Sequence, residues 1–176
     1  MDRSPGRPGA LPNERHHMSV STHDIPPRTV VVGYDGSDES RAALAVAIDR
    51  AQPVDTIVLV HATAPASNWL GTPYYGRAVA QIHEAAERVL DEMRPIAEQV
   101  ETTIEFSVLE GPPAEVLIRA AAVREADEIV VGSRGLGRIR GALGSVSQEL
   151  LRDAARPVLV VTRDAASVRG APALAS

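Results

Sequence analysis

The chain has 176 residues, of which 44% are hydrophobic and 23% charged, a composition typical of a globular protein with a single domain-sized core. Its formal net charge of −5 argues against a protein that coats nucleic acid or anionic membranes. Cysteine is absent, which excludes disulfides, thiolate metal sites and a cysteine nucleophile.

All 18 basic residues are arginines, so the chain contains no lysine. A P-loop NTPase and a protein kinase each need a lysine on the nucleotide phosphates, and a Schiff-base enzyme needs a lysine amine. These three classes of enzyme are therefore excluded.

The two ends of the chain lack periodic apolar patterns. We expect a disordered tail over residues 1–27, which are rich in Pro, Gly, Ser and His, one domain over 28–163, and a flexible tail over 164–176. The apolar stretch of a secretory signal and any run of about 18 apolar residues are missing. Together with the absence of cysteine, this predicts a cytoplasmic location.

Short apolar runs alternate with amphipathic segments along the domain. The runs predict five strands, at 29–35, 56–61, 103–109, 127–131 and 157–162. Helical spacing predicts helices over 40–51, over 79–100 with a kink at Pro95, from Pro112-Pro113 to 121, and from about Ser145, with a loop over 69–76. This order predicts a single doubly wound, Rossmann-like α/β domain, with a five-stranded, mostly parallel sheet and helices on both faces.

In such a sheet, ligands bind beyond the carboxyl ends of the strands, where the strand order reverses. The residues at those ends are Asp35, His61, Glu110 and the segment that follows Val131. Asp35 also fits ordinary turn and helix-cap chemistry, and His61 fits a hydrogen-bonded structural histidine. Both alternatives stay open on the sequence alone.

The segment after the fourth strand holds five glycines between 132 and 144, and its only charged residues are Arg134, Arg138 and Arg140. Ser145 and Gln148 match a capping box, which marks the start of a helix. Glycine lets backbone N–H groups approach a ligand, and a helix N-terminus attracts anions. The pattern favours a bound polyphosphate over a linker with solvated arginines.

Other nucleotide-binding and hydrolytic signatures are missing. A dinucleotide-binding domain carries G-x-G-x-x-G after its first strand, but here the glycines follow the fourth strand. A receiver domain needs a late lysine, and the paired glycines of an ATP-pyrophosphatase loop are absent. Neither G-x-S-x-G nor H-E-x-x-H occurs.

Four fragments, VVVGYDGS at 30–37, Val60-His61, VVGSRGLG at 130–137 and GSVS at 144–147, together closely resemble the universal stress protein family over residues 28–163. The family's ATP-binding branch carries the signature G-x2-G-x9-G-[ST]. The resemblance implies an adenine-nucleotide alpha-hydrolase-like fold and a nucleotide-dependent regulatory role in the stress response.

The resemblance also assigns residues to an adenine end of the site. It implies that Asp35 lies beside the adenine, that Gly33 and Ala62 line the base pocket through their backbones, and that Val131 and Gly132 pack on the nucleoside.

At the phosphate end, the resemblance implies that Arg134 and Gly135 face the phosphates of ATP, with Gly137 and Arg138 close by. The helix N-terminus formed by Gly144, Ser145, Val146 and Ser147 would bind the β- and γ-phosphates. The resemblance further implies Mg²⁺ or Mn²⁺ bound with the phosphates, and a homodimer formed through the last strand, Val158 to Thr162.

One feature departs from the family signature: eight residues, rather than nine, separate Gly135 from Gly144. Removing one residue from a helical segment rotates it by about 100°. A nucleotide-free dimeric interaction module of the same fold is therefore an alternative function.

A third function is an enzyme of the wider adenine-nucleotide hydrolase-like group. No acid that could serve as a base lies between Glu128 and Glu149. We therefore expect at most slow ATP hydrolysis, or autophosphorylation on Ser145 or Ser147.

Overall fold

The computed structural model describes residues 26–65, 72–134 and 143–163. The tails predicted over 1–27 and 164–176 lie outside these residues, apart from Pro26 and Pro27. Across the described ranges, no helix is long and apolar enough to cross a membrane.

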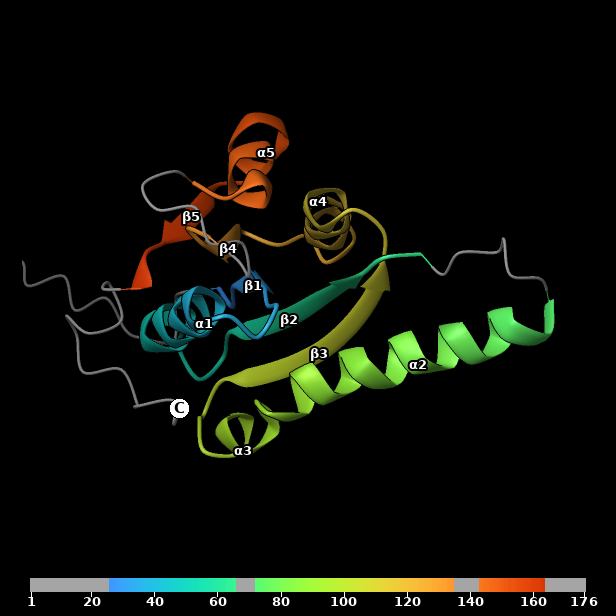
Figure 1. Cartoon of the computed structure of the whole chain (residues 1–176). Helices are drawn as coiled ribbons and strands as arrows, with labels where there is room; N and C mark the ends of the chain where they lie inside the picture. Colours follow the sequence, from blue (N-terminus) through green and yellow to red (C-terminus); the bar gives the residue numbers. More distant parts are fainter. Residues whose placement is uncertain (1–25, 66–71, 135–142, 164–176) are drawn as a thin grey trace, which may run out of the picture.

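The domain is built on one five-stranded sheet in the order β3-β2-β1-β4-β5, and every neighbouring pair is parallel (Figure 1). The strands are β1 (Thr29–Gly33), β2 (Thr56–Thr63), β3 (Thr103–Glu110), β4 (Glu128–Gly132) and β5 (Val158–Val161). This arrangement confirms the predicted doubly wound α/β fold, and it places β3 and β5 at the two edges of the sheet.

The helices cover both faces of the sheet, and the core lies between the layers. They are α1 (Asp38–Arg50), α2 (Thr72–Asp91), α3 (Arg94–Ala97), α4 (Pro113–Val123) and α5 (Ser145–Asp153). Side chains of α1 and α2 pack with Val30 and Val32 of β1, whereas side chains of α4 and α5 pack with Val31 on the opposite face. Successive β1 residues thus point into different halves of the core, so this strand is apolar without a break.

The strand order reverses at β1. The chain runs from β1 outward to β2 and β3, then crosses to the other side of β1 to form β4 and β5. The carboxyl ends of β1 and β4 therefore form the switch point at which a doubly wound sheet binds its ligand.

Two predicted helix boundaries are wrong. The segment 72–76, predicted as part of a loop, belongs to α2, because a proline such as Pro73 is tolerated in a helix's first turn. Trp69 and Gly71 of the same predicted loop lie outside the described residues. The helix predicted through Val100 ends at Asp91, and α3 follows. A proline ring clashes with the carbonyl four residues earlier, and for Pro95 that residue is Asp91.

The amino end of the sheet is closed by buried carboxylates. Asp55 is 3% exposed and accepts hydrogen bonds from the backbone N–H groups of Arg28 at 2.8 Å and Gln52 at 2.9 Å. Glu128 forms ion pairs with Arg28 at 3.1 Å and with Arg50 at 3.4 Å. Each carboxylate is thus satisfied by donors from neighbouring elements.

Candidate functional site

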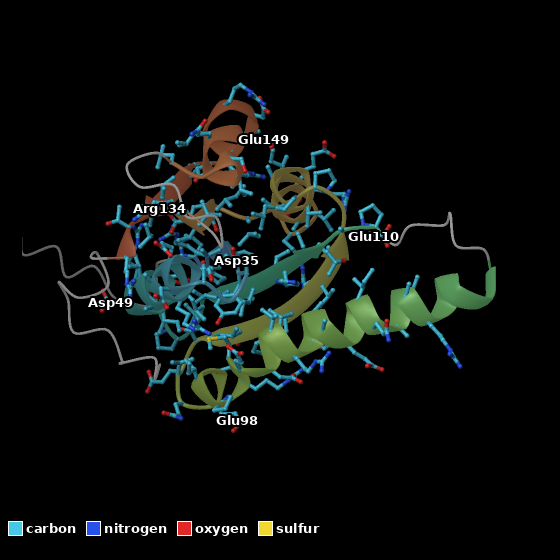
Figure 2. All side chains as sticks on the ribbon, in the orientation of Figure 1. Asp35, Asp49, Glu98, Glu110, Arg134 and Glu149 are labelled. Atoms are coloured by element: carbon cyan, nitrogen blue, oxygen red, sulfur yellow. The ribbon has the colours of Figure 1, made fainter. Side chains whose placement is uncertain are left out.

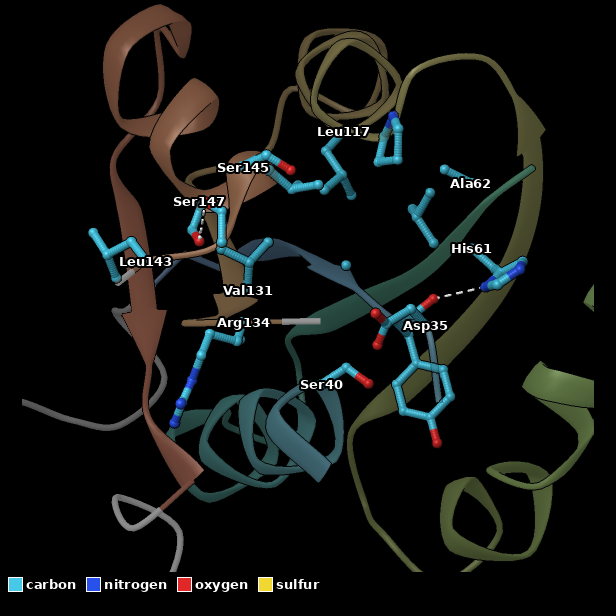
Figure 3. Close-up of a pocket in the computed structure, with 17 residues that line it drawn as sticks. Asp35, Ser40, His61, Ala62, Leu117, Val131, Arg134, Leu143, Ser145 and Ser147 are labelled. Carbon is cyan, nitrogen blue, oxygen red and sulfur yellow. Dashed lines mark hydrogen bonds between the residues drawn. The ribbon is translucent and has the colours of Figure 1, made fainter. Parts of the chain in front are cut away.

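A cavity of about 450 Å³ opens at the carboxyl ends of β1, β2 and β4 (Figure 3). This volume lies within the range of small-molecule sites, roughly 300–1,000 Å³. The cavity brings together Asp35, His61 and the residues after Val131, three of the four strand-end positions that the sequence singled out. Glu110, the fourth, lies at the end of β3 away from Asp35 and lines a separate, smaller hollow (Figure 2).

Asp35 combines turn chemistry with a place in the cavity wall. Its Oδ1 accepts hydrogen bonds from the backbone N–H of Ser37 at 3.0 Å and from the Ser37 hydroxyl at 2.6 Å. Gly36 between them has a φ of +79°, a conformation that glycine adopts without strain. Ser37 is the N-cap of α1 and accepts from the Ser40 N–H. The turn fixes the Asp35 carboxylate at the edge of the cavity.

Part of the cavity wall is apolar. Val60 and Ala62 of β2, Leu117 of α4 and Val131 of β4 line it. At Gly33, a Cβ would lie 2.9 Å from Leu117 Cδ1 and 3.0 Å from Val131 Cγ1, so a larger residue would push the ends of these two side chains away from β1. A flat apolar group, such as a base, fits such a wall.

His61 is held by a backbone contact. Its Nδ1 lies 2.8 Å from the Tyr34 carbonyl oxygen, and since a carbonyl only accepts, Nδ1 carries the proton. In the neutral ring, Nε2 is then an acceptor. The structural interpretation of His61 is confirmed, although its ring also lines the cavity.

The N-terminus of α5 forms another part of the cavity lining. The predicted capping box is wrong by one residue: the N-cap is Gly144, and the Gln148 side-chain amide donates to the Leu143 carbonyl at 2.7 Å. The Ser133 carbonyl accepts from the Gly144 N–H at 2.7 Å and from the Ser147 hydroxyl at 3.2 Å. These contacts attach the start of α5 to the end of β4.

The first N–H groups of a helix have no partner within the helix, and the helix dipole is positive there. In α5 these groups belong to Ser145, Val146 and Ser147, all of which line the cavity. The cavity therefore combines an apolar wall with an anion-attracting helix N-terminus.

Arg134 lines the cavity, but its guanidinium does not point toward α5. The side chain runs toward α1, away from Ser145 and Ser147 (Figure 3), and its Nη2 lies 3.6 Å from Glu39 Oε1. The expected orientation toward phosphates is thus not the orientation seen here. Gly135, Gly137 and Arg138 lie outside the described residues.

Ten of the thirteen residues that the resemblance assigned to ATP line this one cavity, and the other three are not described. The ten are Gly33, Asp35, Ala62, Val131, Gly132, Arg134, Gly144, Ser145, Val146 and Ser147. Sequence reasoning missed Leu117 and Pro113, which come from α4, and Ser40 from α1. Helical periodicity marked Leu117 and Ser40 as inward-facing but could not separate a core position from a cavity wall.

Within the described part of the chain, no group of three or more His, Asp or Glu side chains could hold a metal ion. A divalent cation in this cavity would therefore depend on oxygen ligands supplied by the bound molecule, as Mg²⁺ does when it binds with phosphates.

Fold and cavity together define an α/β protein with a small-molecule cavity at the switch point of a parallel sheet. The family model of the universal stress protein family matches residues 27–162, and the chain belongs to that family. A universal stress protein of Thermus aquaticus is 38% identical over 136 residues, which cover 76% of this chain and 98% of the relative.

Solved structures of the family share the fold. UspA of Lactobacillus plantarum matches with a TM-score of 0.67 at 19% identity, over 78% of this chain and 99% of that chain. An Arabidopsis thaliana family protein with AMP bound matches at 0.59 and 22% identity, over 84% and 99%. A universal stress protein in complex with cAMP matches at 0.59 and 29% identity, over 76% and 96%.

Proposed function

We propose that this protein binds an adenine nucleotide, ATP in the first place, in the cavity at the carboxyl ends of β1 and β4, and acts as a nucleotide-dependent regulator in the stress response. The observation that carries the proposal is the polarity of the cavity. Leu117 and Val131 belong to its apolar wall, and the α5 N-terminus is also part of its lining. A nucleotide combines the same two kinds of chemistry: an aromatic base and an anionic phosphate chain.

Three further observations support this proposal. Asp35 lies on the cavity wall as a hydrogen-bond acceptor that could receive the amino group of a base. The related structures with AMP and cAMP show that members of this fold take adenine nucleotides. The glycine segment, although one residue shorter than the family signature, is followed by an α5 whose first turn lines the cavity.

Mg²⁺ or Mn²⁺ would accompany ATP, held by its phosphates and by hydroxyl groups such as that of Ser145. This fits the described residues, which offer oxygen donors but no carboxylate cluster. The same residues provide no evident base beside the phosphate end, so we expect regulation through occupancy, with hydrolysis or autophosphorylation slow at most. The cytoplasmic location stays a prediction.

The direct experiment is to denature freshly purified protein and to identify any released nucleotide by anion-exchange chromatography. We expect ATP or ADP at close to one per chain. If none is released, calorimetric titration of the protein with Mg-ATP should still show binding. An empty supernatant followed by no heat would contradict nucleotide binding and favour the nucleotide-free interaction module.

A cavity-filling variant tests the location of the site. Ala62→Leu places three more carbon atoms in the cavity wall, so we expect at least a tenfold loss of ATP affinity, about 1.4 kcal/mol. Ala85→Leu makes the same change on an exposed position of α2 and serves as the matched control. Equal affinities for the two variants would show that the nucleotide binds elsewhere.

The last strand supports a second proposal, a homodimer formed through residues 158–162. Strand β5 has a neighbour in the sheet on one side only, and Val158, Leu159 and Val160 are only partly buried. The Pro157 carbonyl accepts a hydrogen bond from the N–H of Ile129 in β4, and the Val161 carbonyl accepts one from the N–H of Ser133, which directly follows β4. Because backbone groups alternate along a strand, those of Val158 and Val160 point to the open edge.

This alternation makes the dimer testable. Val160→Pro removes an N–H from the open edge and leaves the bonds to β4 in place, so we expect a monomer by light scattering after gel filtration. Val160→Thr keeps the N–H and should remain dimeric. A wild-type monomer at micromolar concentration, or a dimeric Val160→Pro variant, would overturn the interface.

A further inference from the structure

The cavity has one cationic side chain among its described lining residues, Arg134, and that cation is already paired. Its Nη2 lies 3.6 Å from Glu39 Oε1, across the junction of β4 and α1. Asp35 is the one carboxylate among the described lining residues. A phosphate bound at the α5 N-terminus could therefore pair with the Arg134 guanidinium only after the ion pair between Arg134 and Glu39 is broken.

Of the two partners, Glu39 is the fixed one. A Cβ built on Gly132 would lie 2.8 Å from both the carbonyl carbon and the Cβ of Glu39, so the first turn of α1 packs directly against the end of β4. The Glu39 side chain is only 16% exposed, and its place in the first turn of α1 favours a carboxylate.

Arg134, by contrast, can move. Its side chain is 34% exposed, and several rotatable bonds separate its guanidinium from the backbone. The nitrogen–oxygen distance exceeds that of a hydrogen bond, so the contact holds the guanidinium by charge alone. A phosphate at the α5 N-terminus would require a change in the rotamer of this side chain.

We propose that Glu39 sets the selectivity of the cavity, by competing with the ligand's phosphate group for Arg134. The competition lowers the affinity for phosphorylated ligands. It leaves the affinity for an uncharged nucleoside unchanged, because a nucleoside has no phosphate to pair with Arg134. This inference rests on the proposed nucleotide function and adds to it a residue outside the cavity lining. Its effect is modest, because partly exposed ion pairs contribute at most about a few-fold in an equilibrium constant.

The test measures the dissociation constants of adenosine, AMP and Mg-ATP by calorimetry. For Glu39→Gln we expect AMP and Mg-ATP to bind about two- to fivefold more tightly, and adenosine to bind with unchanged affinity. Glu39→Asp keeps the charge but shortens the reach, and should act in the same direction. Asp38→Asn removes a charge from the same turn, where Asp38 pairs with Arg41 and Arg163, and is the matched control.

A double-mutant cycle separates competition from a general loss of negative charge. In an Arg134→Gln background, Glu39→Gln should have no effect on AMP or Mg-ATP. If the gain persists in that background, or if Asp38→Asn gives the same gain, competition for Arg134 is overturned. A loss of phosphate affinity in Glu39→Gln would overturn it too, since Glu39 would then orient Arg134 toward the ligand.

Adenosine distinguishes the two proposals. If neither adenosine nor the nucleotides bind the wild type or any variant, both the proposed nucleotide function and this inference are overturned. If adenosine binds normally and Glu39→Gln leaves every affinity unchanged, the inference alone is overturned.

Discussion

The two ends of the sheet contain similar charged groups but use them differently. At the amino end, Asp55 and Glu128 are buried and meet backbone N–H groups and arginines from neighbouring elements, which closes that end. At the carboxyl end, glycines such as Gly33 and Gly132 let side chains and helices approach closely while a cavity of about 450 Å³ remains. The comparison shows that one end supplies stability and the other supplies a site.

If this division is correct, the largest loss of stability will come from the amino end. Asp55→Ala removes the acceptor of two buried, charge-assisted hydrogen bonds, so we expect the free energy of unfolding to fall by about 3 kcal/mol. Urea unfolding measures this loss. Asp55→Asn keeps one oxygen acceptor and should lose less. The nucleotide affinity of the folded variant should not change. A large change would contradict the separation of stability and binding between the two ends of the sheet.

A substitution at the carboxyl end should affect both stability and binding. At Gly132, an alanine Cβ would meet backbone atoms, Glu39 C at 2.8 Å and Arg134 O at 2.9 Å, which no side-chain rotation can relieve. We expect Gly132→Ala to cost about 2 kcal/mol in unfolding free energy and to weaken nucleotide binding.

The matched control is Gly76→Ala on α2, where a Cβ would meet nothing within 4 Å. Alanine is the better helix former, so this variant should be more stable by about 0.5–1 kcal/mol. A Gly132→Ala protein as stable as Gly76→Ala would contradict the close approach of α1 to β4.

The smallest effect concerns Tyr34, whose ring is buried beside α1 at the carboxyl end. Its hydroxyl has no hydrogen-bond partner in the described structure, and burial raises its pKa, with Glu92 acting in the same direction. The nearby charge of Arg41 opposes this shift. Tyr34→Phe should therefore change stability at neutral pH by less than about 1 kcal/mol.

The sign of the pH dependence follows from the raised pKa. Above about pH 10 the unfolded chain loses the Tyr34 proton while the folded protein keeps it, so wild-type stability falls as the pH rises. Tyr34→Phe lacks this contribution and should be the more stable of the two at about pH 11. Unfolding curves at about pH 8 and about pH 11 measure the difference, and parallel declines would contradict it.

Most of the fold could be predicted from the sequence, because buried strands and helix stripes differ in period. The start of α2 was predicted wrongly because proline and glycine are common in loops but also occur in helices. Pro73 and Gly76 both lie within α2. The shift of the α5 cap to Gly144 escaped prediction because Ser145 and Gln148 match a capping box whose geometry is not formed.

The cavity was predictable in outline, since strand ends and glycines mark it, but its charge pairing was not. Glu39 is an acid in the first turn of a helix, a common position that carries no signal of a partner 95 positions away. Only the packing of α1 against Gly132 brings Glu39 to Arg134.

The Ser133 carbonyl, which accepts from both Gly144 and Ser147, has a consequence for how this family can vary. It fixes the start of α5 to β4 independently of the segment between them, so the length of residues 135–142 does not determine where the helix begins. A protein engineer could lengthen or exchange that segment, including restoring the ninth residue, and keep the same helix against the sheet.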